Sequence, residues 1–182
     1  MVKEMLETER LVLRMFRESD TDAYAEMVAD PEVMRFLGKP MSRAEAWRNM
    51  AMVLGHWHLR GYGFWAVEEK GSGEMVGRVG CWRPEGWPGL EVGWALRRRF
   101  WGRGYATEAA TAALDEAFGT LGLEEVCSIP QAGNRASVRV AERLEMRLAR
   151  AVAVPATQAR GALEASCFVI TRDEWRARRQ PR

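Results

Sequence analysis

The 182-residue sequence has few of the side chains that build metal centres or covalent cross-links. It contains two histidines and three widely spaced cysteines, and no C-x-x-C pattern occurs. His56 and His58 lie two positions apart on an expected helix, whereas a metal-binding pair on one helical face needs a spacing of about four. We therefore expect no metal and no disulfide framework, with reduced thiols as in a cytoplasmic protein.

The chain also lacks a large net charge and a long hydrophobic run. Its formal net charge is +2, which is too small to indicate a nucleic-acid-binding protein by itself. No apolar stretch approaches the ~20 residues of a membrane-spanning helix, and the charged start MVKEMLETERL does not resemble a signal peptide. We expect no nucleic acid and no membrane among its partners. Arginines gather near the C-terminus, where we expect a solvated tail: Arg172, Arg176, Arg178, Arg179 and Arg182.

Length and composition are those of one globular domain. Hydrophobic residues make up 47% of the chain and charged residues 29%, so a packed core is expected. A chain of 182 residues falls within the usual range for one domain, and no repeat or linker interrupts it. We therefore expect a single domain over residues 1–182.

Hydrophobic periodicity predicts strands that alternate with helices. Strands are expected at residues 10–16, 64–69, 75–82, 90–96, 125–129, 148–154 and 163–171. Helices are expected at residues 21–29, from a capping box at Ser42 and Glu45 to about Leu59, and at 104–121 and 135–144. This order predicts an α/β (α+β) fold, a mixed sheet with helices on both faces.

The segment EVGWALRRRFWGRGY, residues 91–105, predicts a strand, a glycine-containing loop and the start of a long helix. The first N–H groups of a helix lack internal partners, and the helix dipole places partial positive charge there. Gly102 and Gly104 have no Cβ atom, so a phosphate can approach the backbone closely. Charge-assisted hydrogen bonds can come from three arginines: Arg98, Arg99 and Arg103. These features predict an anion-binding site.

The glycine pattern differs from two common phosphate-binding motifs. A P-loop needs G-K-[ST], which does not follow here, and the dinucleotide motif needs a third glycine. The residues after Gly104 are Tyr105, Ala106 and Thr107 instead. A bare G-x-G also occurs in ordinary turns, but the neighbouring arginines and the helix start favour the anion site.

The pattern R-x-x-G-x-G at Arg99, Gly102 and Gly104 resembles the acetyl-CoA motif of the GNAT N-acetyltransferase superfamily. Further pieces resemble its RimJ/RimL-type branch, in order over nearly all of residues 7–175: ETERLVLRMFRESDTDAYAEMVADPEVMRFLG, EVGWALRRRFWGRGYATEA, GNRASVRVAERLEMRL and FVITRDEW. The resemblance implies the GNAT fold, a mixed six- to seven-stranded sheet splayed between its fourth and fifth strands. It also implies direct transfer of an acetyl group from acetyl-CoA to a primary amine in a ternary complex.

The resemblance implies that acetyl-CoA is the co-substrate and that no metal takes part. In such a fold the backbone of strand 90–96 binds the pantetheine arm, and the loop after it binds the pyrophosphate. The backbone N–H groups of Trp94 and Ala95 are the expected donors to the oxyanion. The full set of implied cofactor-binding residues is Trp94, Ala95, Leu96, Arg98, Arg99, Trp101, Gly102, Arg103, Gly104, Tyr105, Ala106, Asn134 and Ser137.

Glu91 matches the position at which several GNAT enzymes carry their general base. An alkyl ammonium has a pKa of about 10, so a base or an ordered water must remove a proton before the amine attacks. A glutamate partly buried there would have a raised pKa and could act directly or through water. The alternative is a strand-end glutamate in solvent or paired with an arginine.

No tyrosine follows Tyr105, although many GNAT enzymes place one where the leaving thiolate needs a hydrogen bond. In the RimJ/RimL branch a serine in N-x-x-S does this work, and Ser137 in Asn134-x-x-Ser137 matches it. The resemblance thus implies that Ser137 stabilises the thiolate and that Asn134 binds the pantetheine arm. Asn134 can also cap the following helix, and Ser137 could have no further role. The chain departs from the branch at Glu145, where glycine is usual, and at Phe168, where tyrosine often stands.

The acceptor pocket is expected between the two N-terminal helices, the 84–89 loop and the last two strands. Trp65, Trp82 and Trp87 are its candidate wall, although tryptophan at strand spacing is also typical of a core. The acceptor is either a protein N-terminal α-amine, as for ribosomal proteins, or a small amine. A non-catalytic acyl-CoA-binding sensor is the alternative function. Many relatives are homodimers, so a homodimer is a further expectation.

Overall fold

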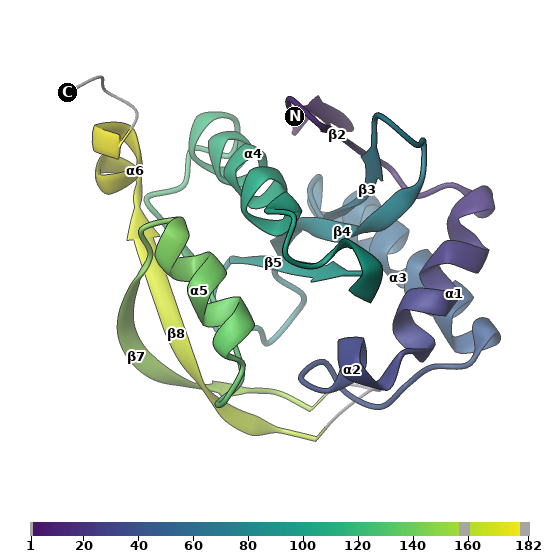
Figure 1. Cartoon of the computed structure of the whole chain (residues 1–182). Helices are drawn as coiled ribbons and strands as arrows, with labels where there is room; N and C mark the ends of the chain where they lie inside the picture. Colours follow the sequence, from purple (N-terminus) through teal and green to yellow (C-terminus); the bar gives the residue numbers. More distant parts are fainter. Residues whose placement is uncertain (1, 157–160, 179–182) are drawn as a thin grey trace.

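The computed structural model describes residues 2–156 and 161–178. Eight strands form one mixed sheet in the order β1-β2-β3-β4-β5-β6-β8-β7 (Figure 1). The strands are β1 (Met5–Glu7), β2 (Leu11–Arg14), β3 (Phe64–Glu69), β4 (Met75–Trp82), β5 (Glu91–Leu96), β6 (Glu125–Ser128), β7 (Arg147–Val154) and β8 (Leu163–Thr171). The seven expected strands are therefore confirmed, and β1 adds an eighth at the sheet edge, where it pairs with β2.

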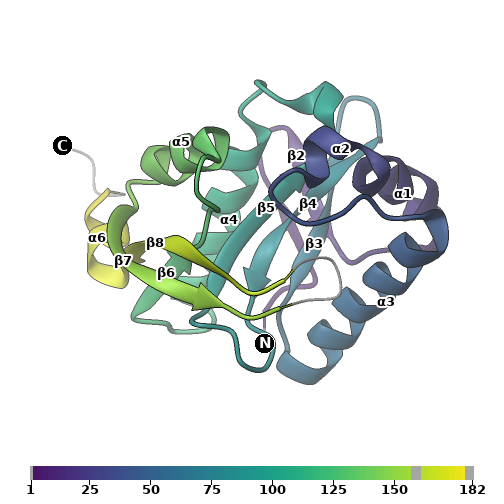
Figure 2. The same ribbon diagram turned by 90° about the horizontal axis from the view of Figure 1, so that it is seen from below.

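The helices cover both faces of the central strands, as expected. They are α1 (Thr21–Ala29), α2 (Pro31–Met34), α3 (Arg43–Arg60), α4 (Tyr105–Gly119), α5 (Arg135–Arg143) and α6 (Arg172–Arg178), with 3-10 turns η1 (Glu18–Asp20) and η2 (Arg98–Phe100). Figure 1 shows α4 in front of β4 and β5, with α3 behind them. From below, α1, α2 and α3 lie at one end of the molecule and β7, β8, α5 and α6 at the other (Figure 2).

The predicted capping box of α3 is confirmed. Ser42 Oγ accepts a hydrogen bond from Glu45 N–H, and the Glu45 carboxylate accepts one from Ser42 N–H at 2.8 Å. The helix ends at Gly61, whose φ of 74° lies in the left-handed region that glycine tolerates best. These two ends fix the helix that carries Asn49 over the central strands.

A buried ion pair fixes the start of α1 against β2. Arg14 donates two hydrogen bonds of 2.8 Å to Asp20 and a third of 2.8 Å to Glu68 on β3. Asp20 is the main cause of the raised pKa of Arg14, so the guanidinium stays charged despite burial. Tyr24, one turn further along α1, is thereby held fully buried above the sheet.

The prediction of a solvated C-terminal tail is wrong for part of that segment, because residues 172–178 form α6. Trp175 is buried and packs near Phe118, which draws the segment onto the domain. Arg172 donates to Leu123 O at 2.8 Å, and Arg178 pairs with Glu145 at 3.2 Å. Arg176 is exposed as expected, whereas Arg179 and Arg182 lie outside the described residues.

The sheet separates between β5 and β6. These strands are parallel and pair at one position, Glu91 opposite Cys127, where Cys127 N–H donates to Leu90 O at 2.9 Å. By contrast, β4 and β5 pair over six positions from Glu91 to Leu96. The expected splay between strands four and five of a seven-stranded sheet is therefore present. It falls between β5 and β6 because the extra edge strand β1 shifts the count to eight.

Candidate active site

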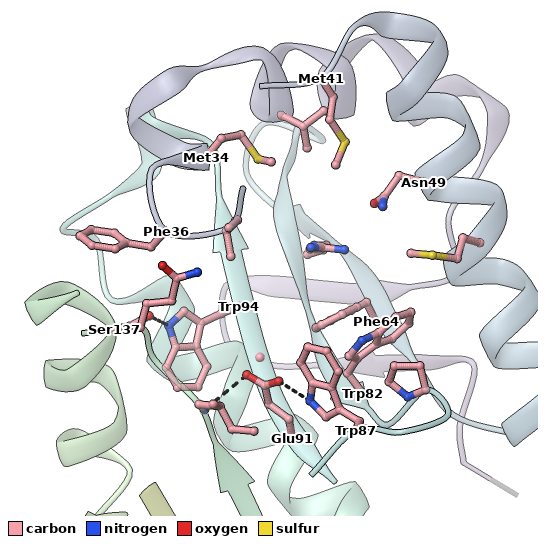
Figure 3. Close-up of a pocket in the computed structure, with 18 of the residues that line it drawn as sticks. Met34, Phe36, Met41, Asn49, Phe64, Trp82, Trp87, Glu91, Trp94 and Ser137 are labelled. Atoms are coloured by element: carbon pink, nitrogen blue, oxygen red, sulfur yellow. Dashed lines mark hydrogen bonds between the residues drawn. The ribbon is translucent and has the colours of Figure 1, made fainter. Parts of the chain in front are cut away.

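A pocket of about 740 Å³ lies beside the opening between β5 and β6, here called the β5–β6 opening (Figure 3). Its lining comes from the α1–α3 region, from β3, β4 and β5, and from the segment between β6 and α5. In Figure 3, Met34, Phe36 and Met41 approach from the helical side, and Phe64, Trp82, Trp87 and Glu91 from the sheet side. The pocket therefore joins an apolar wall to a carboxylate.

Glu91 begins β5 and stands in the wall of this pocket. Its Oε2 accepts a hydrogen bond from Trp87 Nε1 at 2.9 Å, and its Oε1 accepts one from Ile129 N–H at 3.3 Å (Figure 3). These bonds connect the loop before β5 to the chain just after β6. Two N–H donors on separate segments fix the orientation of the carboxylate.

Ser137 and Trp94 meet across the β5–β6 opening. Trp94 Nε1 donates to Ser137 Oγ at 3.0 Å (Figure 3). Asn134 Oδ1 accepts a hydrogen bond from Ser137 N–H at 3.1 Å, which confirms Asn134 as the N-cap of α5. Because Oγ is the acceptor for Trp94, the hydroxyl hydrogen of Ser137 remains to be donated.

Successive residues of β5 direct their backbone N–H and C=O groups alternately toward β4 and toward the β5–β6 opening. Arg97 N–H donates to Val76 O at 2.9 Å, so odd-numbered residues of β5 exchange hydrogen bonds with β4. The N–H and C=O of Trp94 therefore point to the β5–β6 opening, whereas those of Ala95 pair with Arg78 on β4. The prediction that Ala95 N–H serves as an oxyanion donor is wrong, because the sheet already uses that group.

The glycine loop (residues 97–104) leads directly into α4. Gly102 and Gly104 have φ values of 76° and 82°, and Gly104 is the N-cap of the helix. Within the described chain, the backbone N–H groups of residues 102–107 have no hydrogen-bond partner. Trp101 Nε1 donates to Leu96 O at 2.8 Å, which ties the loop to the end of β5. A row of free amides at a helix start has the form of an anion site.

Each of the three arginines expected at the anion site has a carboxylate partner on a neighbouring element. Arg98 pairs with Asp30 at 3.0 Å, Arg99 with Glu74 at 2.7 Å, and Arg103 with Glu69 at 3.5 Å. Tyr105 Oη also donates to Glu69, and this bond is the main cause of the raised pKa of the Tyr105 hydroxyl. The arginines are about half exposed, where an ion pair contributes roughly 0–1 kcal/mol. Each arginine can therefore exchange its carboxylate partner for a phosphate at little cost in free energy.

Of the three tryptophans expected around the acceptor, Trp82 and Trp87 line the pocket and Trp65 does not. Trp65 is fully buried, donates to Lys3 O at 3.2 Å and packs edge-on against Trp57 at 5.1 Å. Successive side chains of a strand point to opposite faces. Its neighbour Phe64 faces the pocket, so Trp65 faces away, and its prediction as a pocket residue is wrong.

The structure adds pocket residues that sequence reasoning missed, chiefly Arg78, Asn49 and Tyr24. One signal for Arg78 was present, since it is the single charged residue in the otherwise apolar strand MVGRVGCW. Such a charge in a buried strand usually has a partner or a function. Asn49 and Tyr24 give no such signal, because helix spacing alone does not say which polar residue faces a pocket.

The described residues contain no group of three or more His, Cys, Asp or Glu side chains placed to hold a metal ion. None of the helices formed by residues 2–156 and 161–178 is long and apolar enough to cross a membrane. The three cysteines are free and buried.

A splayed mixed sheet, a carboxylate-bearing pocket beside the splay and an amide-rich loop at a helix start define the architecture of an acyl-CoA-dependent transferase. Residues 10–147 match the sequence model of the acetyltransferase (GNAT) domain. The chain therefore belongs to the GNAT acetyltransferase family.

Several proteins of known sequence or structure are similar to this chain. The chain is 32% identical to YkkB of Bacillus subtilis (strain 168) over 160 residues, which cover 82% of this chain and 89% of YkkB. It is 28% identical to the N-acetyltransferase p20 of Bacillus licheniformis over 147 residues, covering 79% and 83% of the two chains. The crystal structure of an acetyltransferase from Agrobacterium tumefaciens str. C58 superposes with a TM-score of 0.78 at 33% identity, covering 91% and 93%.

Proposed function

We propose that this protein moves the acetyl group of acetyl-CoA to a primary amine by direct transfer, with both substrates bound at once. The observation that carries the proposal is the position of Glu91, a carboxylate in the pocket wall at the one position where β5 and β6 pair, beside the β5–β6 opening. A primary amine is protonated near neutral pH, because its pKa is about 10, and it must lose a proton to attack. Glu91 accepts that proton, directly or through water.

The free backbone groups suit the parts of acetyl-CoA. The unpartnered N–H groups of residues 102–107 suit a diphosphate, and the positive end of the α4 dipole favours its charge. Trp94 N–H and C=O, which point to the β5–β6 opening, suit the pantetheine arm and the thioester oxygen. Asn134 keeps its amide N–H groups for the arm while its Oδ1 caps α5.

The transfer uses three groups of this chain. Glu91 takes one proton from the bound ammonium, so that the neutral amine attacks and the new N–C bond forms. The nitrogen of the adduct then loses its second proton, and the leaving CoA sulfur takes up one proton as the C–S bond breaks. Trp94 N–H donates to the oxygen on which negative charge develops. Ser137 donates its hydroxyl hydrogen to the sulfur as the C–S bond breaks, which stabilises the leaving thiolate until it gains a proton. No acyl-enzyme is formed, so each turnover needs both substrates together.

Replacing Ser137 by alanine tests the proposed role at the sulfur. Loss of one hydrogen bond to a developing charge, about 1.5 kcal/mol, is expected to lower kcat about tenfold. The acetyl-CoA affinity is expected to stay within about threefold, because the helix cap of Asn134 uses Ser137 N–H and not its side chain. The measurement is thiol release at saturating amine. The control is Ser19→Ala, because Ser19 is exposed and lies outside the pocket lining. An unchanged kcat in Ser137→Ala would contradict the role.

Amine-dependent release of the CoA thiol tests the function itself. The panel contains small primary amines and short peptides with free N-termini, because the sequence leaves both acceptor classes open. Release that requires an amine supports the enzyme, whereas tight acetyl-CoA binding with no release across the panel supports the sensor. Membership of the RimJ/RimL-type branch stays a prediction that the preferred acceptor will test.

A further inference from the structure

A cation without a counter-charge lies in the acceptor pocket. Arg78 on β4 is partly buried, and its guanidinium carbon lies 4.5 Å from the centre of the Phe64 ring. Within the described residues, its side chain makes no ion pair and no hydrogen bond. Arginine has five N–H donors and no acceptor. This side chain is therefore ready to bind an anion.

Stacked rings hold the Arg78 guanidinium in place. Phe64 stacks on Trp82 with ring centres 5.0 Å apart, and Trp82 stacks on His56 at 4.2 Å. Burial lowers the pKa of His56, so the far end of the stack is neutral near pH 7. Cation–π contact with an aromatic face stabilises an arginine without using its N–H donors. Those donors stay available to a ligand.

A second donor group, the amide of Asn49, lines the same pocket as Arg78. Tyr24 Oη donates to Asn49 Oδ1 at 2.6 Å, which leaves the two amide hydrogens of Asn49 to be donated elsewhere. Burial raises the pKa of Tyr24, and the positive charge of Arg78 opposes that rise. Arg78 and Asn49 together are called the carboxylate subsite below.

The carboxylate subsite and Glu91 lie on one face of the sheet. Arg78 pairs with Ala95 and Trp82 pairs with Glu91, so the two positions are four residues apart, or about 13 Å along the strand. The Phe64 ring stands between them. A Cβ atom added at Gly93 would lie 3.2 Å from that ring and 3.8 Å from Glu91 Oε1. Glu91 and the Arg78 guanidinium therefore line the same pocket, on opposite sides of the Phe64 ring.

The other charged side chains that line the pocket do not pair with Arg78. Lys39 pairs with Glu45 at 3.7 Å, and Glu85 pairs with Arg60 at 3.0 Å. A further arginine, Arg48, is exposed and adds positive charge at the rim. Beside these polar groups, the helical side of the pocket carries Met52 and the apolar side chains of Met34, Phe36 and Met41, which Figure 3 shows.

From this arrangement we infer that the acceptor is an amine that also carries a carboxylate, in the manner of an amino acid or a short peptide with a free C-terminus. The carboxylate binds Arg78 and the Asn49 amide, the amine faces Glu91, and an apolar portion packs on the methionines. The inference rests on the proposed function for the fate of the amine. Polyamines fit poorly, because their positive charges would meet Arg78 without compensation.

Equilibrium binding tests the carboxylate subsite apart from catalysis. Trp82, Trp87 and Trp94 line the pocket, so their fluorescence reports on a bound ligand. The probes are L-phenylalanine and glycyl-L-phenylalanine, each compared with its C-terminal amide, and spermidine, all near pH 6.5, where the amines are protonated. A charge-assisted contact predicts that at least one acid binds about 10- to 100-fold more tightly than its amide.

The same comparison in Arg78→Gln is expected to lose that preference, and Arg78→Lys to keep part of it. Arg43→Gln is the matched control, because Arg43 is exposed and pairs with Asp22 outside the pocket. Unchanged acetyl-CoA affinity in each variant shows that the fold is intact. Equal binding of acid and amide, a preference that survives in Arg78→Gln, or no binding of either acid would overturn the inference.

The two proposals fail in different ways. If the acids bind through Arg78 but no primary amine releases the CoA thiol, the proposed function is wrong while the carboxylate subsite stands. If spermidine or the amides are acetylated as well as the acids, and Arg78→Gln changes nothing, the enzyme stands and the subsite is wrong.

Discussion

Replacing Glu91 by glutamine is expected to lower kcat for the preferred amine by about 100- to 1,000-fold, the usual contribution of a positioned general base. Glutamine keeps the size of the side chain and can still accept a hydrogen bond from Trp87 or Ile129, so the pocket shape is retained. It cannot take up a proton. The acetyl-CoA affinity is expected to change by less than about threefold, because Glu91 faces the acceptor pocket and not the glycine loop. Steady-state thiol release and calorimetry measure the two quantities.

Glu32→Gln provides the control for this variant. Glu32 is an exposed carboxylate on α2 outside the pocket lining, so the kcat of Glu32→Gln is expected to match that of the unmodified protein. Raising the pH also distinguishes loss of the general base from distortion of the pocket. Activity of Glu91→Gln should recover partly at high pH, where more of the amine is already neutral. An unaltered kcat in Glu91→Gln would remove Glu91 from the mechanism.

Replacing Gly104 by valine is expected to weaken acetyl-CoA binding by at least about 100-fold. Gly104 has a φ of 82°, which a β-branched residue adopts only with strain, and its added Cβ would lie 3.5 Å from Arg10. The valine side chain would also stand beside the free N–H groups of residues 102–107, where the diphosphate is proposed to bind. Calorimetric titration with acetyl-CoA and with CoA measures the loss.

Gly61→Val is the matched control for backbone strain. Gly61 has a φ of 74° at the end of α3, and an added Cβ there has no heavy atom within 4 Å. Valine at either position costs roughly 1–2 kcal/mol of stability, because both backbones are left-handed. We expect similar losses in thermal stability for the two variants and loss of acetyl-CoA affinity in Gly104→Val alone. Equal acetyl-CoA affinities of the two variants would show that the glycine loop does not bind the phosphates.

Local sequence signals predicted the parts of the fold that depend on neighbouring residues. The capping box at Ser42, the glycine at the start of α4 and the Asn134 cap of α5 each act within one turn, so their patterns are readable without tertiary contacts. The segments missed were short or depend on packing. β1 has three residues and lies at the sheet edge, and α6 forms because Trp175 packs near Phe118.

The candidate site was predicted less completely, because strand register decides which side chains meet. Trp65 and Phe64 are adjacent in sequence, yet the strand alternation turns one into the core and the other into the pocket. The contact between Trp94 and Ser137 joins residues 43 positions apart across the β5–β6 opening. The pairing of Tyr24 with Asn49 likewise joins two helices. No local pattern specifies such contacts.

Calorimetric titration of the protein with acetyl-CoA tests whether the glycine loop binds the co-substrate. We expect one acetyl-CoA per chain, bound with a Kd in the micromolar range, and binding that falls with Gly104→Val and persists in Glu91→Gln. This result would place the co-substrate at the glycine loop independently of any acceptor. A titration that shows no binding by the intact, folded protein would contradict the assignment of residues 97–104 and the acetyl transfer that rests on it.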